Sequence, residues 1–159
     1  DVARPACGRS RMTQTGLRSA EERREEVRAN AAAMGIDEAY ISTLVETFYA
    51  RIREHPLLGP IFENAIGDEW ERHLATMKNF WASVALNAGL YSGKPVPAHV
   101  KHTEIQPWHF NIWLALFEQT LKDTAPTPGV VTYFLERAER IAQSLQLAMF
   151  GLPIGRNAS

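Results

Sequence analysis

The chain has 159 residues, of which 45% are hydrophobic, so it can bury the core of one ordinary domain. Its 17 basic and 18 acidic side chains give a formal net charge of -1, which lacks the basic excess of a nucleic-acid-binding protein. The single cysteine, Cys7, excludes disulfide frameworks and cysteine-rich zinc or iron-sulfur sites within the chain.

Neither a membrane span nor a secretion signal is evident in the sequence. No uninterrupted apolar run approaches the ~18 residues of a spanning helix, and residues 1–20 lack the apolar centre of a signal peptide. We therefore expect a cytoplasmic protein with no membrane or nucleic-acid partner. Residues 1–18 show no periodicity and are expected to form a flexible tail, within which Met12 is a candidate start. Residues 151–159 are expected to form a C-terminal tail.

The first predicted helix occupies residues 19–35 and precedes a domain of residues 36–150. Ser19 and Glu22 match the S-x-x-E pattern of a capping box, and Gly35 is a natural C-terminal cap. The apolar face of this helix is thin, so we expect the helix to lie on the surface.

The second predicted helix begins after Asp37 and ends at Pro56. Its apolar residues recur at helical spacing and form one stripe: Ile41, Val45, Phe48, Tyr49 and Ile52. Residues 56–67 then contain two prolines and two glycines, which predicts short helical turns instead of a long helix. These turns are expected to place Leu58, Ile61 and Phe62 against the core.

Asp68 is predicted to cap the third helix, which runs to about Asn87. His73, Met77, Phe80 and Trp81 lie on one of its faces, at i, i+4, i+7 and i+8. A loop with two glycines and a proline follows, and His99 lies just beyond it. Two imidazoles that face each other across an aromatic pocket suit a flat apolar cofactor with a central metal better than a bare metal cage.

The last two predicted helices begin at prolines. One begins at Gln106-Pro107 and ends near Asp123, and its face carries Phe110, Trp113, Leu114 and Phe117. The other begins at Thr127-Pro128 and carries Val131, Phe134, Ala138, Ile141 and Leu145 at helical spacing. No segment alternates with a strand period for long, so the fold class is all-α.

Familiar catalytic and metal-binding patterns are missing from the sequence. The five histidines include no H-E-x-x-H motif, and there is no G-x-S-x-G motif or phosphate-binding glycine loop. The remaining candidates for a functional site are three rings that are expected to face inward, each with one polar hydrogen-bonding group: Tyr49, His73 and Trp113. Burying them together is costly without a partner. A bound diatomic ligand is one such partner, and backbone carbonyls or water are the alternative.

Four segments, in their order and spacing, resemble the group III truncated haemoglobins. They are FYARIREHPLLGPIF at 48–62, EWERHLATMKNFW at 69–81, YSGKPVPAH at 91–99 and HFNIWLALF at 109–117. The absence of a Gly-Gly pair fits group III rather than group II. The resemblance spans about 37–150 and implies a truncated globin fold, in which two helices pack over two around haem b.

The resemblance also assigns roles to individual residues. It makes His99 the proximal ligand of the haem iron, whereas His102 does not match. The other cofactor-binding residues are Phe62, which stacks on the haem edge, Met77, which lies over the iron, Phe110 and Trp113. The distal ligand-binding set is Tyr49, His73 and Trp113, with His73 as a gate or as an iron ligand when no other ligand is present.

Three functions remain open at this point. The first is binding of O2, NO or CO with slow release, because Tyr49 and Trp113 donate hydrogen bonds to the ligand. The second is a haem-dependent redox enzyme, such as a nitric oxide dioxygenase or a peroxidase-like catalyst, served by an unidentified reductase. The third is a helical interaction module without a cofactor. The helix at 19–35 covers the pocket, mediates dimer contacts or is merely solvated, and its weak apolar face favours the last.

Overall fold

The computed structural model describes residues 19–86 and 104–151. The predicted N-terminal tail, residues 152–159 of the predicted C-terminal tail and the two histidines His99 and His102 lie outside these residues. Within them the chain forms only helices, as predicted. These are α2 (Ala20–Met34), α3 (Glu38–Glu54), α4 (Gly59–Ile66), α5 (Trp70–Leu86), α7 (Pro107–Thr124) and α8 (Pro128–Phe150).

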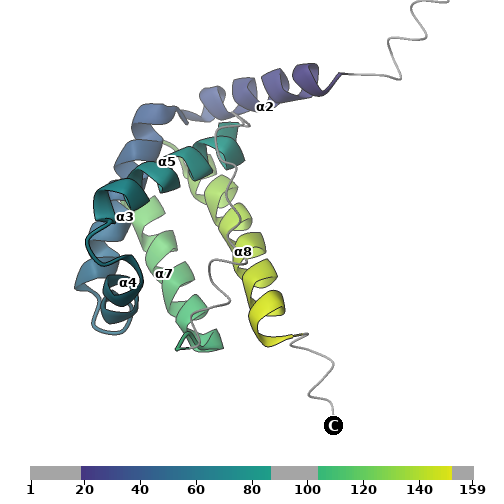
Figure 1. The fold of residues 1–159 in the computed structure, drawn as a ribbon. Helices are drawn as coiled ribbons and strands as arrows, with labels where there is room; N and C mark the ends of the chain where they lie inside the picture. Colours follow the sequence, from purple (N-terminus) through teal and green to yellow (C-terminus); the bar gives the residue numbers. More distant parts are fainter. Residues whose placement is uncertain (1–18, 87–103, 152–159) are drawn as a thin grey trace, which may run out of the picture.

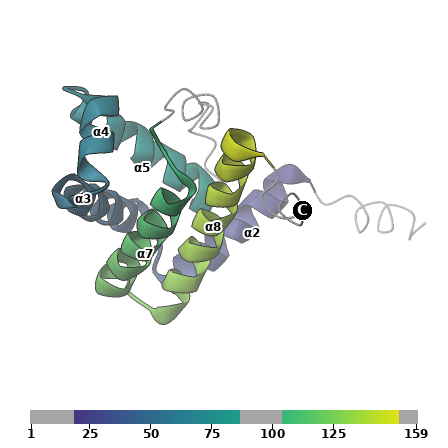
Figure 2. The same ribbon diagram turned by 90° about the horizontal axis from the view of Figure 1, so that it is seen from below.

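Two pairs of helices make the body of the fold. α7 and α8 pack against each other along one side, and α3 packs against both α5 and α7 (Figures 1 and 2). The short α4 packs on α3, and α2 packs on α5. None of the helices in the described ranges is long and apolar enough to cross a membrane.

Local capping signals account for several helix ends. The Ser19 hydroxyl accepts from the Glu22 backbone N–H at 3.0 Å, and the Ser19 N–H donates to the Glu22 carboxylate at 3.0 Å, which confirms the capping box. Gly35 ends α2 with a φ of 95°, in the left-handed region that glycine favours. The Asp37 carboxylate accepts from the Tyr40 N–H at 2.8 Å and caps α3.

One local prediction, the cap of the third helix, needs correction. α5 begins at Trp70, so the residue before it is Glu69 and not Asp68. The reason is a turn at Gly67, where φ is 63° and the Glu69 N–H donates to the Ile66 carbonyl at 3.1 Å. In α8, Val131 is partly buried and packs against the core, and its neighbour Val130 is fully buried.

The stripe predicted on α3 is the centre of the core. Its members are all buried, and Phe48 lies between rings from α7, with centroids 4.9 Å from Phe117 and 5.6 Å from Trp113. Trp81 of α5 stacks on Phe117 at 5.2 Å. Phe48 and Trp81 thus tie α3 and α5 to the same stretch of α7, which fixes the faces that meet in the middle of the fold.

The N-terminal helix α2 lies on the surface, as its thin apolar face predicted. Its residues up to Glu26 are exposed, and Ala31 near its C-terminal end is fully buried. The Arg28 side chain donates to the Leu86 carbonyl at 3.3 Å, which ties this end to the end of α5. The rest of α2 extends away from the body of the fold (Figure 1).

Candidate functional site

A cavity of about 140 Å³ lies between the two helix pairs. It is lined by Tyr49, Leu58, Ile61, Phe62, His73, Met77, Phe80, Trp81, Ile105, His109, Phe110, Trp113, Ile141, Ala142 and Leu145. These residues come from α3, α4, α5, α7 and α8, from the turn before α4 (Leu58) and from the segment before α7 (Ile105), and none comes from α2. No carboxylate, lysine or arginine is among them, so the cavity is apolar apart from a few neutral ring groups.

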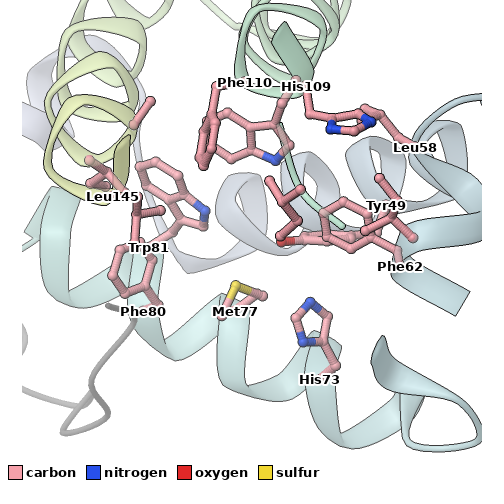
Figure 3. Close-up of a pocket in the computed structure, with 15 residues that line it drawn as sticks. Tyr49, Leu58, Phe62, His73, Met77, Phe80, Trp81, His109, Phe110 and Leu145 are labelled. Atoms are coloured by element: carbon pink, nitrogen blue, oxygen red, sulfur yellow. The ribbon is translucent and has the colours of Figure 1, made fainter. Parts of the chain in front are cut away.

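One wall of the cavity is the face of α5 that the sequence predicted. His73, Met77, Phe80 and Trp81 all line it, because their spacing brings them to the same side of the helix (Figure 3). Facing them are Tyr49 of α3 and Phe62 of α4. The structure therefore brings together Phe62, Met77, Phe110, Tyr49, His73 and Trp113, the predicted site residues within its described ranges.

Tyr49 presents a buried phenol to this cavity. Its side chain is 5% exposed, and its ring packs edge-on against Phe62 at 6.0 Å and His73 at 4.9 Å. Burial alone raises the pKa of the Tyr49 phenol above its usual value, and no described residue shares a hydrogen bond with the hydroxyl to offset that rise. The phenol is therefore a neutral donor at physiological pH, held in an apolar cavity.

Trp113 reaches the cavity from α7 and is held by two rings. Its indole stacks nearly parallel on Phe117, with centroids 5.6 Å apart and an angle of 8°. Phe48 meets it edge-on at 5.6 Å. Because the indole stacks on one ring and meets a second ring edge-on, it has little freedom to rotate. Core packing therefore sets its position, and not the occupant of the cavity.

His109 is a cavity residue to which the sequence analysis gave no role. It is 9% exposed, and its Nδ1 accepts from the Gln106 backbone N–H at 2.8 Å. The neutral imidazole therefore carries its proton on Nε2. The signal that could have found it is spacing, because His109 precedes Trp113 by four residues and so lies on the same face of α7.

A second missed residue is Trp70, at the start of α5. It is 8% exposed and does not line the cavity, but its ring contacts two that do, Tyr49 at 6.1 Å and His73 at 5.7 Å. Its indole N–H is buried without a hydrogen-bond partner among the described residues. Burying an N–H without a partner typically costs about 1–3 kcal/mol of stability. The N–H therefore does not explain why a tryptophan occupies this position.

An all-helical fold with an apolar, ring-lined cavity between two helix pairs has the form of a globin. No protein-family model matches the chain. It is, however, 37% identical over 118 residues to the group 3 truncated hemoglobin of Campylobacter jejuni, covering 72% of this chain and 92% of that protein. It also matches the crystal structure of a group III truncated hemoglobin from Campylobacter jejuni, with a TM-score of 0.69, 37% identity and coverage of 72% of this chain and 92% of that one. The chain therefore belongs to the group III truncated haemoglobins.

Membership of this family implies that the protein is a haem-binding globin. The residues that line the cavity suit haem. Haem is flat and largely apolar, and the cavity offers aromatic and aliphatic walls on α4, α5, α7 and α8. Haem supplies four in-plane nitrogens, so a single imidazole suffices as the protein ligand. The Tyr49 hydroxyl, with no described partner, is a donor that the cavity can offer to a small ligand.

Proposed function

We propose that the domain of residues 36–150 binds haem b in this cavity and takes up dioxygen or a similar diatomic ligand there. The observation that carries the proposal is the Tyr49 hydroxyl, a buried neutral donor without a described partner in an apolar cavity. His99 is the proposed iron ligand, and it lies outside the described residues. When bound, haem supplies an iron with an open position for a small ligand.

The proposed cofactor-binding residues support haem by shape and by excluding water. Phe62 and Met77 lie on the α4 and α5 sides of the cavity, and Phe110 and Trp113 lie on the α7 side. These four side chains expose carbon, sulfur or ring faces, which pack well against a flat apolar cofactor. They also keep the cavity dry, which strengthens any hydrogen bond made inside it.

Tyr49 and Trp113 are the proposed hydrogen-bond donors to the ligand. Tyr49 is on α3 and Trp113 is on α7, so the two side chains line the cavity from different helices. Each hydrogen bond is worth about 1 kcal/mol or more in a dry pocket. Together they slow ligand release, which suits capture, sensing or redox chemistry better than transport.

A haem-dependent redox enzyme is the second proposed function, and one observation favours it. The imidazole of His73 packs against the Tyr49 ring at 4.9 Å, which puts a titratable group beside the proposed ligand donor. A histidine in that position can hold or transfer a proton during nitric oxide dioxygenase or peroxidase-like chemistry. Sustained turnover with an electron donor and a reductase would distinguish this function from simple binding.

The test of the first proposal is the absorption spectrum of the purified protein, recorded ferric, then reduced, then with carbon monoxide. We expect a Soret band whose reduced carbon monoxide form is that of a histidine-ligated haem. A colourless protein that takes up no added haemin would overturn the proposal. It would leave the helical interaction module, in which the rings only pack.

A further inference from the structure

The indole of Trp70 does not line the cavity but contacts two polar rings that do, those of Tyr49 and His73. Its centroid is 5.7 Å from the His73 ring at 87° and 6.1 Å from the Tyr49 ring at 63°. Trp70 and His73 are three residues apart on α5, and a helical side chain leans toward the residue three or four positions before it. The imidazole of His73 therefore leans toward Trp70, which limits how far it can turn in that direction.

Trp70 also contacts an arginine that belongs to an ion pair. The guanidinium carbon of Arg53 lies 4.3 Å from the centre of the Trp70 ring, within the range of a cation-π contact. The Arg53 Nε donates to a Glu63 carboxylate oxygen at 2.9 Å. Arg53 is on α3, Glu63 on α4 and Trp70 on α5, so this cluster joins three helices. We call these three residues the Trp70 clamp.

Close backbone packing supports the clamp. A Cβ atom added at Gly59, the first residue of α4, would lie 2.7 Å from the Arg53 carbonyl oxygen. Only glycine allows this approach without a shift of the backbone. The first turn of α4 is therefore pressed onto the last turn of α3, which keeps Glu63 within reach of Arg53.

The choice of tryptophan at this position needs an explanation, because its N–H makes no hydrogen bond to a described residue. A phenylalanine would fill much of the same space without burying that N–H. The indole differs in having a larger ring face, which is the best partner for a guanidinium. The contact with Arg53 is thus what tryptophan adds here.

We propose that Trp70 is a positioning residue of the ligand cavity. Arg53 and Glu63 hold its indole, and the indole fixes the imidazole of His73 against the Tyr49 ring. The clamp thereby sets how readily a small ligand enters and how it is oriented. This inference rests on the proposed function, since it concerns the donors that face the ligand.

The experiment compares carbon monoxide binding to haem-loaded variants, with two measurements. The infrared C–O stretching band reports the polar surroundings of the ligand, and flash photolysis gives its association rate. Trp70→Phe and Arg53→Met are expected to broaden or split the band and to change the rate by about threefold or more. Arg53→Lys keeps the cation and is expected to restore part of the wild-type band.

Arg51→Met is the matched control. Arg51 is on the same helix and also forms an ion pair, with Asp123 at 2.9 Å, but it is not part of the Trp70 clamp, whose cation-π contact is made by Arg53. Its removal is expected to lower stability and leave the band unchanged. Salt gives an independent measurement, because the Arg53–Glu63 pair is about half exposed and high salt screens such pairs. Raising the salt should move the wild-type band toward that of Glu63→Gln.

The outcomes separate this inference from the function on which it rests. A wild-type band in both Trp70→Phe and Arg53→Met, with a changed band in Tyr49→Phe, would overturn the clamp alone. A wild-type band in all three variants would overturn the proposed ligand donor as well. An equal change in Arg51→Met would show a general loss of packing and would also overturn the clamp.

Discussion

The phenol ring of Tyr49 meets the imidazole of His73 nearly at right angles, with centroids 4.9 Å apart and an angle of 83°. Tyr49 is on α3 and His73 is on α5, so this contact joins two helices across the cavity. Trp113 faces the same cavity from α7. Three polar ring groups that are far apart in the sequence are thus neighbours around one apolar space.

Tyr49→Phe is expected to speed dissociation of dioxygen by about five- to tenfold, because it removes a hydrogen bond worth about 1 kcal/mol. Stopped-flow replacement of dioxygen by carbon monoxide measures this rate. The variant should unfold with nearly the wild-type free energy, since no described residue loses a hydrogen bond. Tyr40→Phe is the control, because its hydroxyl pairs with Thr124 at 3.0 Å and does not line the cavity. Equal dissociation rates in Tyr49→Phe and wild type would show that the phenol does not contact the ligand.

Stability should fall at alkaline pH partly because of Tyr49. Burial raises the pKa of its phenol in the folded state, whereas the unfolded chain titrates near the usual value of about 10. Above that pH the folded state binds more protons than the unfolded state, so the free energy of unfolding decreases as pH rises. Urea unfolding at about pH 8 and about pH 11 should show a smaller decrease for Tyr49→Phe than for wild type.

The alkaline experiment has an internal comparison in Tyr40. Burial also raises the pKa of the Tyr40 phenol, and the hydrogen bond with Thr124 partly offsets the rise. Tyr40→Phe should therefore remove less of the pH dependence than Tyr49→Phe. The reverse order would contradict the burial assigned to the two phenols.

Trp113→Phe should also speed ligand release, by about fivefold, if its indole N–H donates to the ligand. Phenylalanine keeps a ring that can stack on Phe117, so packing changes less than hydrogen bonding. Trp81→Phe is the matched control, since Trp81 stacks on the same Phe117 at 5.2 Å and lines the same cavity. A similar effect of both substitutions would mean that the change is not specific to the N–H of Trp113.

Much of the fold could be predicted because its signals are local. The capping box at Ser19, Gly35 and the prolines at the start of α7 and α8 each act within a few residues. The stripe on α3 needs only helical spacing. The prediction that Asp68 caps α5 is wrong, because after the turn at Gly67 the helix begins only at Trp70. A short sequence motif does not indicate that shift.

The residues that surround the cavity are harder to predict than the helices. His73 and Met77 follow from one helical face, but the Trp70 clamp depends on the angle at which α4 and α5 meet α3. No pattern in the sequence relates Arg53 to Trp70, because each looks like an ordinary member of its own helix. His109 was missed for a related reason: its Nδ1 accepts from the Gln106 N–H, a contact that the motif around Trp113 does not indicate.

His99→Ala is expected to abolish normal haem retention, since the proposal makes His99 the proximal ligand of the iron. Transfer of haem to an excess of an apo-globin, followed by absorption, measures the rate of loss. His102→Ala is the control because His102 is three residues further along and has no proposed role. Unchanged haem retention in His99→Ala would refute the proposed ligand.

The last prediction concerns α2, whose role was left open. Residues 19–26 are exposed, and none of α2 lines the cavity, so a chain that begins at residue 27 should keep its haem and its dioxygen dissociation rate. Its free energy of unfolding should fall by less than about 1 kcal/mol, because surface changes are usually small. Gly35→Ala should cost more, since φ is 95° and the added Cβ would lie 2.9 Å from Pro126. Chemical unfolding of both variants measures the difference. A large loss of haem affinity in the shortened chain would instead show that the first turns of α2 act on the pocket, as a cover or through a dimer.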